Sequence, residues 1–151
     1  MAILLIDTNI LVYAYDRAAA EKQRRAIDLL HQIHTARVGT VSAQTLSEFF
    51  SVTTRKLMPP LTPTEAEKQL QAFAAQWPVL PVTEQVVLEA ARGARMYQLH
   101  FWDAQIWAAA RLNGVPLVFS EDCNANAVIE GVRFVNPFAP DFEWTNWEDE
   151  Y

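Results

Sequence analysis

Short, almost wholly apolar segments alternate along the chain with longer segments of helical character, and this alternation restricts the possible folds more than any other feature. The apolar segments have the length of strands that are buried on both faces. We expect strands at Ala2–Ile6, Val38–Val41, Val79–Val82, Val115–Phe119 and Val132–Val135. We expect helices beginning near Ile10 and over Ala18–Ala36, Ser42–Leu57, Pro63–Trp77, Glu84–Gln98 and Asp103–Leu112. The pattern predicts an α/β fold with a central, mainly parallel β-sheet flanked by α-helices.

The chain has the size of one domain, and its composition allows a sizeable core. Of its 151 residues, 51% are hydrophobic and 20% are charged, which excludes intrinsic disorder. It has no internal repeat and no Gly/Ser linker. We assign residues 1–138 to a single domain and residues 139–151 to an acidic, aromatic C-terminal tail. We expect this tail to pack on the domain or on a partner without forming regular structure.

Several features predict a cytoplasmic protein that does not associate with membranes. The longest apolar runs, Ala2–Ile6 and Ile10–Tyr15, are too short to cross a bilayer. Asp7 interrupts the first run and no basic residue precedes it, so a secretory signal is not expected. The single cysteine, Cys123, cannot form an internal disulfide, and we expect it to be a packed small hydrophobe.

The net charge of -6 argues at first against a nucleic-acid partner. Five of the 18 acids, however, lie in the last fifteen residues, which contain no Lys or Arg, so the rest of the chain has 13 acids and 12 bases. Pairs such as Arg24–Arg25 and Arg55–Lys56 could contact phosphate, although a solvated helix face explains any single pair better. The charge therefore permits an RNA or DNA substrate without indicating one.

Two acids lie just after expected strands, at the edge of the sheet where parallel α/β folds bind ligands. Asp7 follows the first strand, and Asp122 comes three residues after the strand that ends at Phe119. Each has an ordinary alternative: Asp7 could cap the next helix, and Asp122 could be a solvated turn residue.

Two further acids lie on expected helices. Asp103 shares a helical face with Ile106, Trp107 and Ala110, so we expect it to point into the protein or a cleft, where it needs a cation. A buried ion pair with an arginine would meet that need equally well. Glu48, by contrast, lies opposite the apolar stripe of its helix, so its position alone predicts a solvated surface acid.

Converging carboxylates need a counterion. Two like charges roughly 4 Å apart repel by about 4 kcal/mol at an effective dielectric constant near 20. A hard divalent cation such as Mg²⁺ or Mn²⁺ relieves this repulsion, because it prefers oxygen ligands. Such an ion can also activate water for attack on a phosphodiester. A site of this kind needs neither a histidine nor a cysteine nucleophile.

Four segments in order resemble the acidic motifs of PIN-domain nucleases. The first is Leu4-Leu5-Ile6-Asp7-Thr8-Asn9, and the second is Ala43-Gln44-Thr45-Leu46-Ser47-Glu48-Phe49. The third is His100-Phe101-Trp102-Asp103-Ala104, and the fourth is Leu117-Val118-Phe119-Ser120-Glu121-Asp122. Residues 128–138 are similar to the C-terminal signature of VapC-type toxins within that family. Each motif is weak alone, but the four together span nearly the whole chain.

The resemblance implies a Mg²⁺- or Mn²⁺-dependent endoribonuclease, the toxin of a type II toxin–antitoxin pair. It implies that the catalytic acids are Asp7, Glu48, Asp103 and Asp122, and that Asp7, Asp103 and Asp122 are the metal ligands. Asn9 and Ser120 match polar positions that support the carboxylates, and Glu121 competes with Asp122 for the fourth position. The implied partners are an RNA substrate, a small antitoxin protein and a second copy of the chain in a homodimer.

Other residues and other functions compete with this interpretation. His31 and His34 could share a metal, but two helix-surface histidines explain them better, and His100 is a weaker candidate for a general base. The five tryptophans could stack on bases, although core packing or a dimer surface accounts for aromatic residues more often. The alternative functions are a non-catalytic PIN-like binding module and a phosphoacceptor or phosphatase domain.

Overall fold

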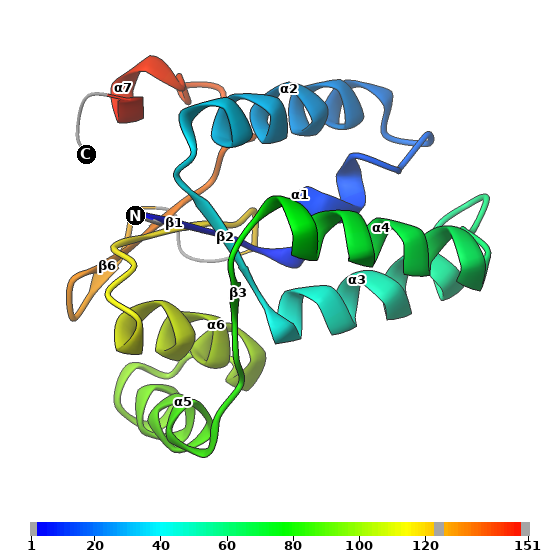
Figure 1. Ribbon diagram of the computed structural model, residues 1–151. Helices are drawn as coiled ribbons and strands as arrows, with labels where there is room; N and C mark the ends of the chain where they lie inside the picture. Colours follow the sequence, from blue (N-terminus) through cyan, green and yellow to red (C-terminus); the bar gives the residue numbers. More distant parts are fainter. Residues whose placement is uncertain (1–2, 123–125, 149–151) are drawn as a thin grey trace.

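The computed structural model describes residues 3–122 and 126–148. Its centre is a six-stranded sheet in the order β3-β2-β1-β4-β6-β5, in which only β5 runs antiparallel to its neighbour (Figure 1). The predicted mainly parallel sheet is therefore confirmed. The strands are β1 (Leu4–Ile6), β2 (Gly39–Ser42), β3 (Val79–Leu80), β4 (Leu117–Phe119), β5 (Val128–Ile129) and β6 (Val132–Val135).

The side of the sheet on which the chain adds new strands changes at β1. From β1 it proceeds to β2 and β3 on one side, and then crosses to β4 on the other side. β1 and β4 pair in parallel, with Leu4 opposite Leu117 and Ile6 opposite Phe119. In open α/β sheets such a reversal leaves a crevice outside the carboxyl ends of the two strands, where ligands bind.

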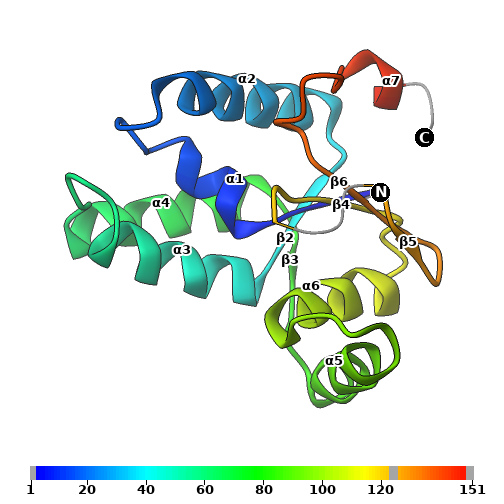
Figure 2. The same ribbon diagram turned by 180° about the vertical axis from the view of Figure 1, so that it is seen from behind.

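Helices cover both faces of the sheet. α5 and α6 lie on one face and α2 on the other, while α1, α3 and α4 pack together beside the sheet (Figures 1 and 2). Among the described residues, no helix is long and apolar enough to cross a membrane. The helices are α1 (Thr8–Tyr13), α2 (Ala20–Ala36), α3 (Ala43–Arg55), α4 (Pro63–Gln76), α5 (Glu84–Tyr97), α6 (Phe101–Leu112) and α7 (Thr145–Glu148).

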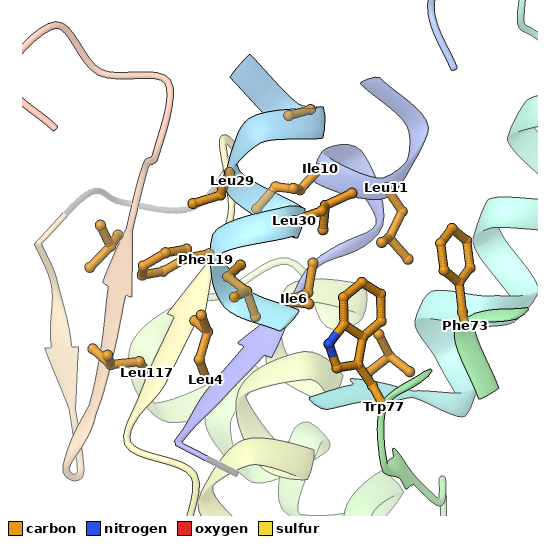
Figure 3. Packing of buried hydrophobic residues seen from close by; sticks show 14 of the residues in the cluster. Leu4, Ile6, Ile10, Leu11, Leu29, Leu30, Phe73, Trp77, Leu117 and Phe119 are labelled. Carbon is orange, nitrogen blue, oxygen red and sulfur yellow. The ribbon is translucent and has the colours of Figure 1, made fainter. Parts of the chain in front are cut away.

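The alternation of side chains along the strands produces two separate cores. Leu4 and Ile6 of β1 join Phe119 of β4 in the core beneath α2 (Figure 3). Leu5 and Val118, which point the other way, pack beneath α5 and α6. Both strands are fully buried, which explains why their sequences are continuously apolar rather than alternating.

Most of the predicted boundaries agree with the structure to within two residues. The Thr62 and Glu65 capping box that opens α4 is present, with Pro63 in the first turn. The hairpin strand β5 was not predicted, because two residues carry no usable periodicity. In α2, Ile27 stands at helical spacing with Leu30 and Ile33 in the sequence but is 50% exposed. The inner face of α2 is formed instead by Ala26, Leu29, Leu30 and Ile33.

The C-terminal tail packs on the core face beneath α2. Arg25 donates hydrogen bonds of 3.0–3.3 Å to the carbonyl oxygens of Phe138, Pro137 and Ala139. Farther along, three aromatic rings surround Phe119 edge-on. They belong to Phe142, Trp144 and Trp147. The expectation that the tail lacks regular structure is wrong, because Thr145–Glu148 forms the single-turn helix α7.

α5 and α6 pack closely against each other at Gly93. A Cβ atom at this position would lie 2.8 Å from Cε3 of the buried Trp107 and would contact Cζ3 even more closely. Both atoms belong to the six-membered ring of the indole, so the contact cannot be relieved by a flexible chain end.

We predict that Gly93→Ala destabilises the protein by about 1–3 kcal/mol, because it overpacks this contact. At an exposed helical position the same change would stabilise by roughly 1 kcal/mol. Urea denaturation measures the effect. In a Trp107→Phe background, which removes the six-membered ring of the indole, Gly93→Ala should cost clearly less. An equal cost in both backgrounds would contradict the packing argument.

Candidate active site

Asp7 lies where β1 ends and α1 begins, and it is only 6% exposed. Its backbone N–H donates to the carbonyl oxygen of Phe119 (3.0 Å), which extends the β1–β4 pairing by one residue. Its Oδ1 accepts a hydrogen bond from the N–H of Thr8 (2.7 Å), so Asp7 is indeed the N-cap of α1. Its Oδ2 accepts from Oγ of Ser120 (2.7 Å). The cap role and a role in the site are therefore compatible.

The charge of Asp7 is unfavourable in this position. Burial raises the pKa of its carboxyl from the ordinary 3.8 to about 6, although the hydrogen bonds from Ser120 and Thr8 oppose the rise. The negative charges of Glu48 and Asp103 raise the pKa further. The structure therefore brings these two acids, which are distant in sequence, into electrostatic contact with Asp7.

Glu48 is not the solvated surface acid that its position on the helix predicted. Its Oε2 accepts a hydrogen bond from Oγ1 of Thr8 (2.7 Å), and its Oε1 accepts from Nε2 of Gln44 (2.8 Å). From the sequence we expect an apolar stripe through Leu46, Phe50, Thr53 and Leu57. α3 instead turns so that Gln44, Thr45 and Phe49 are buried together with Thr53, while Leu46 and Phe50 are only partly buried. Buried threonines form this face because their hydroxyls have partners, such as Oγ1 of Thr53 donating to the carbonyl of Phe49.

Two buried glutamines join Glu48 to the helix that carries Asp103. Nε2 of Gln44 also donates to the carbonyl of Trp102 (3.0 Å), and Nε2 of Gln105 donates to Oε1 of Gln44 (2.7 Å). The network fixes the start of α6 relative to α3. The sequence analysis missed Thr8, Gln44 and Gln105. Two signals were present: Thr8 stands between Asp7 and Asn9, and Gln44 precedes Glu48 by one helical turn.

Asp103 lies half-buried in the first turn of α6. Burial raises the pKa of its carboxyl, and the negative charges of Asp122 and Glu48 add to the rise, whereas the positive charge of His100 opposes it. Within residues 3–122 and 126–148, neither Asp103 nor the other three acids forms an ion pair with Lys, Arg or His. The alternative of a buried arginine partner for Asp103 is therefore not supported.

In the loop after β4, the two candidates for the fourth acid, Asp122 and Glu121, have different hydrogen-bond partners. Nδ2 of Asn9 donates to Oδ2 of Asp122 (3.1 Å) and to Oγ of Ser120 (3.2 Å). The neighbouring Glu121 instead forms an ion pair with Lys22 (2.7 Å) and accepts from Tyr13. Glu121 thus has its own cation, whereas Asp122 is exposed and held by Asn9. Cys123, the next residue, lies outside the described residues.

The four acids present the oxygen donors that Mg²⁺ and Mn²⁺ prefer, with mutual repulsion and no pairing cation. This chemistry fits a divalent metal. Among the described residues, however, no three His, Cys, Asp or Glu side chains converge closely enough to enclose one ion. A protein cage is not required for Mg²⁺, which commonly binds through one or two carboxylates together with water and substrate phosphate. His31 and His34 are exposed on α2, as predicted.

The chain matches the PIN domain over residues 4–129. It belongs to the PIN-domain family. Members of this family are generally metal-dependent, and they are typically nucleases. The match covers β1 to β5 and therefore all four acids, which confirms the resemblance drawn from the motifs.

Solved structures of toxin–antitoxin proteins share this PIN fold, although no curated protein matches the sequence. A toxin–antitoxin complex from Klebsiella pneumoniae aligns with a TM-score of 0.65 at 19% identity, covering 89% of this chain and 98% of that one. DNA-bound VapBC from Salmonella typhimurium aligns with a TM-score of 0.63 at 19% identity, covering 89% of this chain and 97% of that one. The sarcin–ricin loop cleaving toxin VapC20 of Mycobacterium tuberculosis aligns with a TM-score of 0.62 at 19% identity, covering 86% of this chain and 98% of that one.

The raised pKa of Asp7 predicts a pH-dependent stability in the metal-free PIN domain. A carboxyl whose folded pKa lies above its unfolded value stabilises the fold at low pH, and this contribution is lost as the pH rises through about 6. In EDTA at pH 7.5, Asp7→Asn should therefore be more stable than the wild type by about 1–3 kcal/mol. The difference should shrink between pH 6 and pH 4, as measured by urea denaturation.

A matched control is Asp28→Asn, which changes an exposed aspartate on α2 and should leave stability nearly unchanged at every pH. Saturating Mg²⁺ should stabilise the wild type and the control, but Asp7→Asn much less. A variant that is less stable than the wild type in EDTA would contradict the electrostatic account of this site.

Proposed function

We propose that this PIN-domain protein is a Mg²⁺- or Mn²⁺-dependent endoribonuclease that acts as the toxin of a type II toxin–antitoxin pair. One observation carries the proposal: carboxylates from separate parts of the chain gather at the carboxyl edge of the sheet. Burial and the charges of neighbouring carboxylates raise the pKa of Asp7 and of Asp103, and within the described residues none of the four acids forms an ion pair with a basic side chain. A purely structural cluster of this kind would weaken the fold with no compensating interaction. A bound divalent metal would supply the positive charge that these carboxylates need.

Each polar residue has a distinct part in the proposed reaction. Asp7, Asp103 and Asp122 would hold the metal, which when bound would neutralise charge on the phosphodiester and make a water molecule more acidic. Glu48 is held by Thr8 and Gln44 with its charge directed at this same region, where it orients the attacking water. The roles of Asn9 and Ser120 are given by their hydrogen bonds, which keep Asp7 and Asp122 from turning away.

Support for the toxin assignment comes from the structural neighbours, which include toxin–antitoxin complexes, some of them bound to DNA. We infer that this chain likewise pairs with a small antitoxin protein, forms a homodimer and works in the cytoplasm, where its RNA substrate is found. The likeness of VapC20, described as a sarcin–ricin loop cleaving toxin, favours RNA as the substrate class.

We predict that Asp103→Asn lowers the rate of RNA cleavage in saturating Mg²⁺ at least about 100-fold, because it removes a metal-binding charge at the reacting phosphate. The measurement is cleavage of single-stranded RNA by purified protein, with and without EDTA. Asp28→Asn, purified in parallel, should retain wild-type activity and thereby exclude a contaminating nuclease.

The same assay separates the alternatives. A non-catalytic PIN-like binding module would bind RNA without cleaving it, whether or not Mg²⁺ is present. A phosphatase domain would release inorganic phosphate from a phosphomonoester, and a phosphoacceptor domain would retain label from a phosphodonor. Cleavage by Asp103→Asn at the wild-type rate would refute the assignment of the site.

A further inference from the structure

An open groove of about 530 Å³ lies between α3 and α6, directly beside the carboxylates. Glu48 belongs both to the groove and to the acidic site, so the two are continuous. The volume falls within the range of about 300–1,000 Å³ that is usual for small-molecule sites. Its wall includes Trp102, Val82, Ser47, Ser51, Gln105 and Glu48.

Trp102 differs from the other tryptophans of the chain. Trp77 and Trp107 are buried in the cores, and Trp144 and Trp147 pack on the core from the tail. Trp102 is 54% exposed, although it occupies the first turn of α6 next to Asp103. Core packing therefore accounts for four of the five tryptophans and leaves this one unexplained.

The remaining wall of the groove is neutral and can form hydrogen bonds. Ser47 and Ser51 place hydroxyls one helical turn apart on α3, and Gln105 contributes a side chain that is only 6% exposed. Nε2 of Gln105 is used by Gln44, while its Oε1 accepts no hydrogen bond from any side chain or backbone group among the described residues. This oxygen is therefore able to accept a hydrogen bond from a ligand that enters the groove.

The charge of the groove selects among ligands. In the part of the chain that the structure describes, its wall carries no Lys or Arg, and the Glu48 carboxylate would repel a phosphate group. A flat, neutral ring with hydrogen-bond donors at its edge matches both the exposed indole and the amide acceptor. Nucleobases are such rings, and their stacking on aromatic side chains is a common way to bind single-stranded nucleic acid.

We infer that this groove binds an unstacked nucleobase of the RNA substrate, next to the phosphodiester at the carboxylates, with Trp102 stacking on the base. The inference rests on the proposed function, since it places a nucleotide of the same substrate. Trp102 then binds and orients the strand, Gln105 accepts a hydrogen bond from the base edge, and the backbone phosphate is left at the acidic site.

The test measures affinity rather than cleavage, in an Asp103→Asn background that leaves the RNA intact. The probe is a short, fluorescein-labelled single-stranded RNA of random sequence, followed by fluorescence anisotropy. Trp102→Ala should weaken binding about 5- to 150-fold, as expected for one lost stacking contact, and Trp102→Phe should retain most of the affinity. Leu112→Ala, an exposed apolar change in the last turn of the same helix, should bind like the parent.

A second probe is an abasic ribose-phosphate oligomer of the same length, which removes the bases from the ligand instead of the indole from the protein. The Asp103→Asn parent, which retains Trp102, should bind this oligomer about as weakly as its Trp102→Ala variant binds normal RNA. The Trp102→Ala protein should distinguish the two oligomers much less. A preference for bases that is the same with and without the indole would overturn the inference.

The outcomes also separate this inference from the proposed function. RNA cleavage by the wild type together with unchanged RNA affinity in Trp102→Ala would overturn the groove assignment alone. If Trp102→Ala then changed the oligomeric state, the groove would be a surface for self-association. Failure of the parent protein to bind the RNA, combined with absence of cleavage by the wild type, would refute the proposed function and the groove assignment together.

Discussion

The repulsion among carboxylates at one edge of the sheet is the constraint on which the rest of the site depends. Asp7 is buried at the end of a central strand, and its ordinary behaviour there would be to remain protonated up to pH values near 6. Hydrogen bonds from Thr8 and Ser120 stabilise its charged form in part. In the proposed reaction a divalent cation would offset the rest of this cost, which would couple folding to metal binding through the same few oxygens.

The surrounding structure keeps these charges in place without neutralising them. Asn9 spans the gap between α1 and the loop after β4, and the Gln44–Gln105 pair joins α3 to α6. Both sets use neutral amides. An arginine in either position would have lowered the pKa of the carboxylates and occupied the place of a metal. Lys22 instead pairs with Glu121, the neighbour of Asp122.

Much of the fold could be predicted from local pattern. The strands beside the site are continuously apolar because both faces are covered, and the Thr62–Glu65 box opens α4 where expected. The errors arose where the pattern was short or shared between faces. β5 has two residues, and α3 offered an apolar stripe through Leu46 and Phe50 that the protein does not use as its buried face. Gln44, Thr45 and Phe49 are buried instead, together with Thr53 of the expected stripe.

The sequence by itself determined the α/β class, the position of Asp7 at a strand end and the membership of Asp103 in an inward-facing helical turn. These depend on periodicity and on adjacent residues, which any reader of the chain can inspect. Only the tertiary structure decided that Glu48 faces Thr8, that Glu121 pairs with Lys22, and that Trp102 remains exposed beside the acids. Such facts depend on how helices rotate against one another, because a rotation of one residue position, about 100°, exchanges a buried side chain for a solvated one.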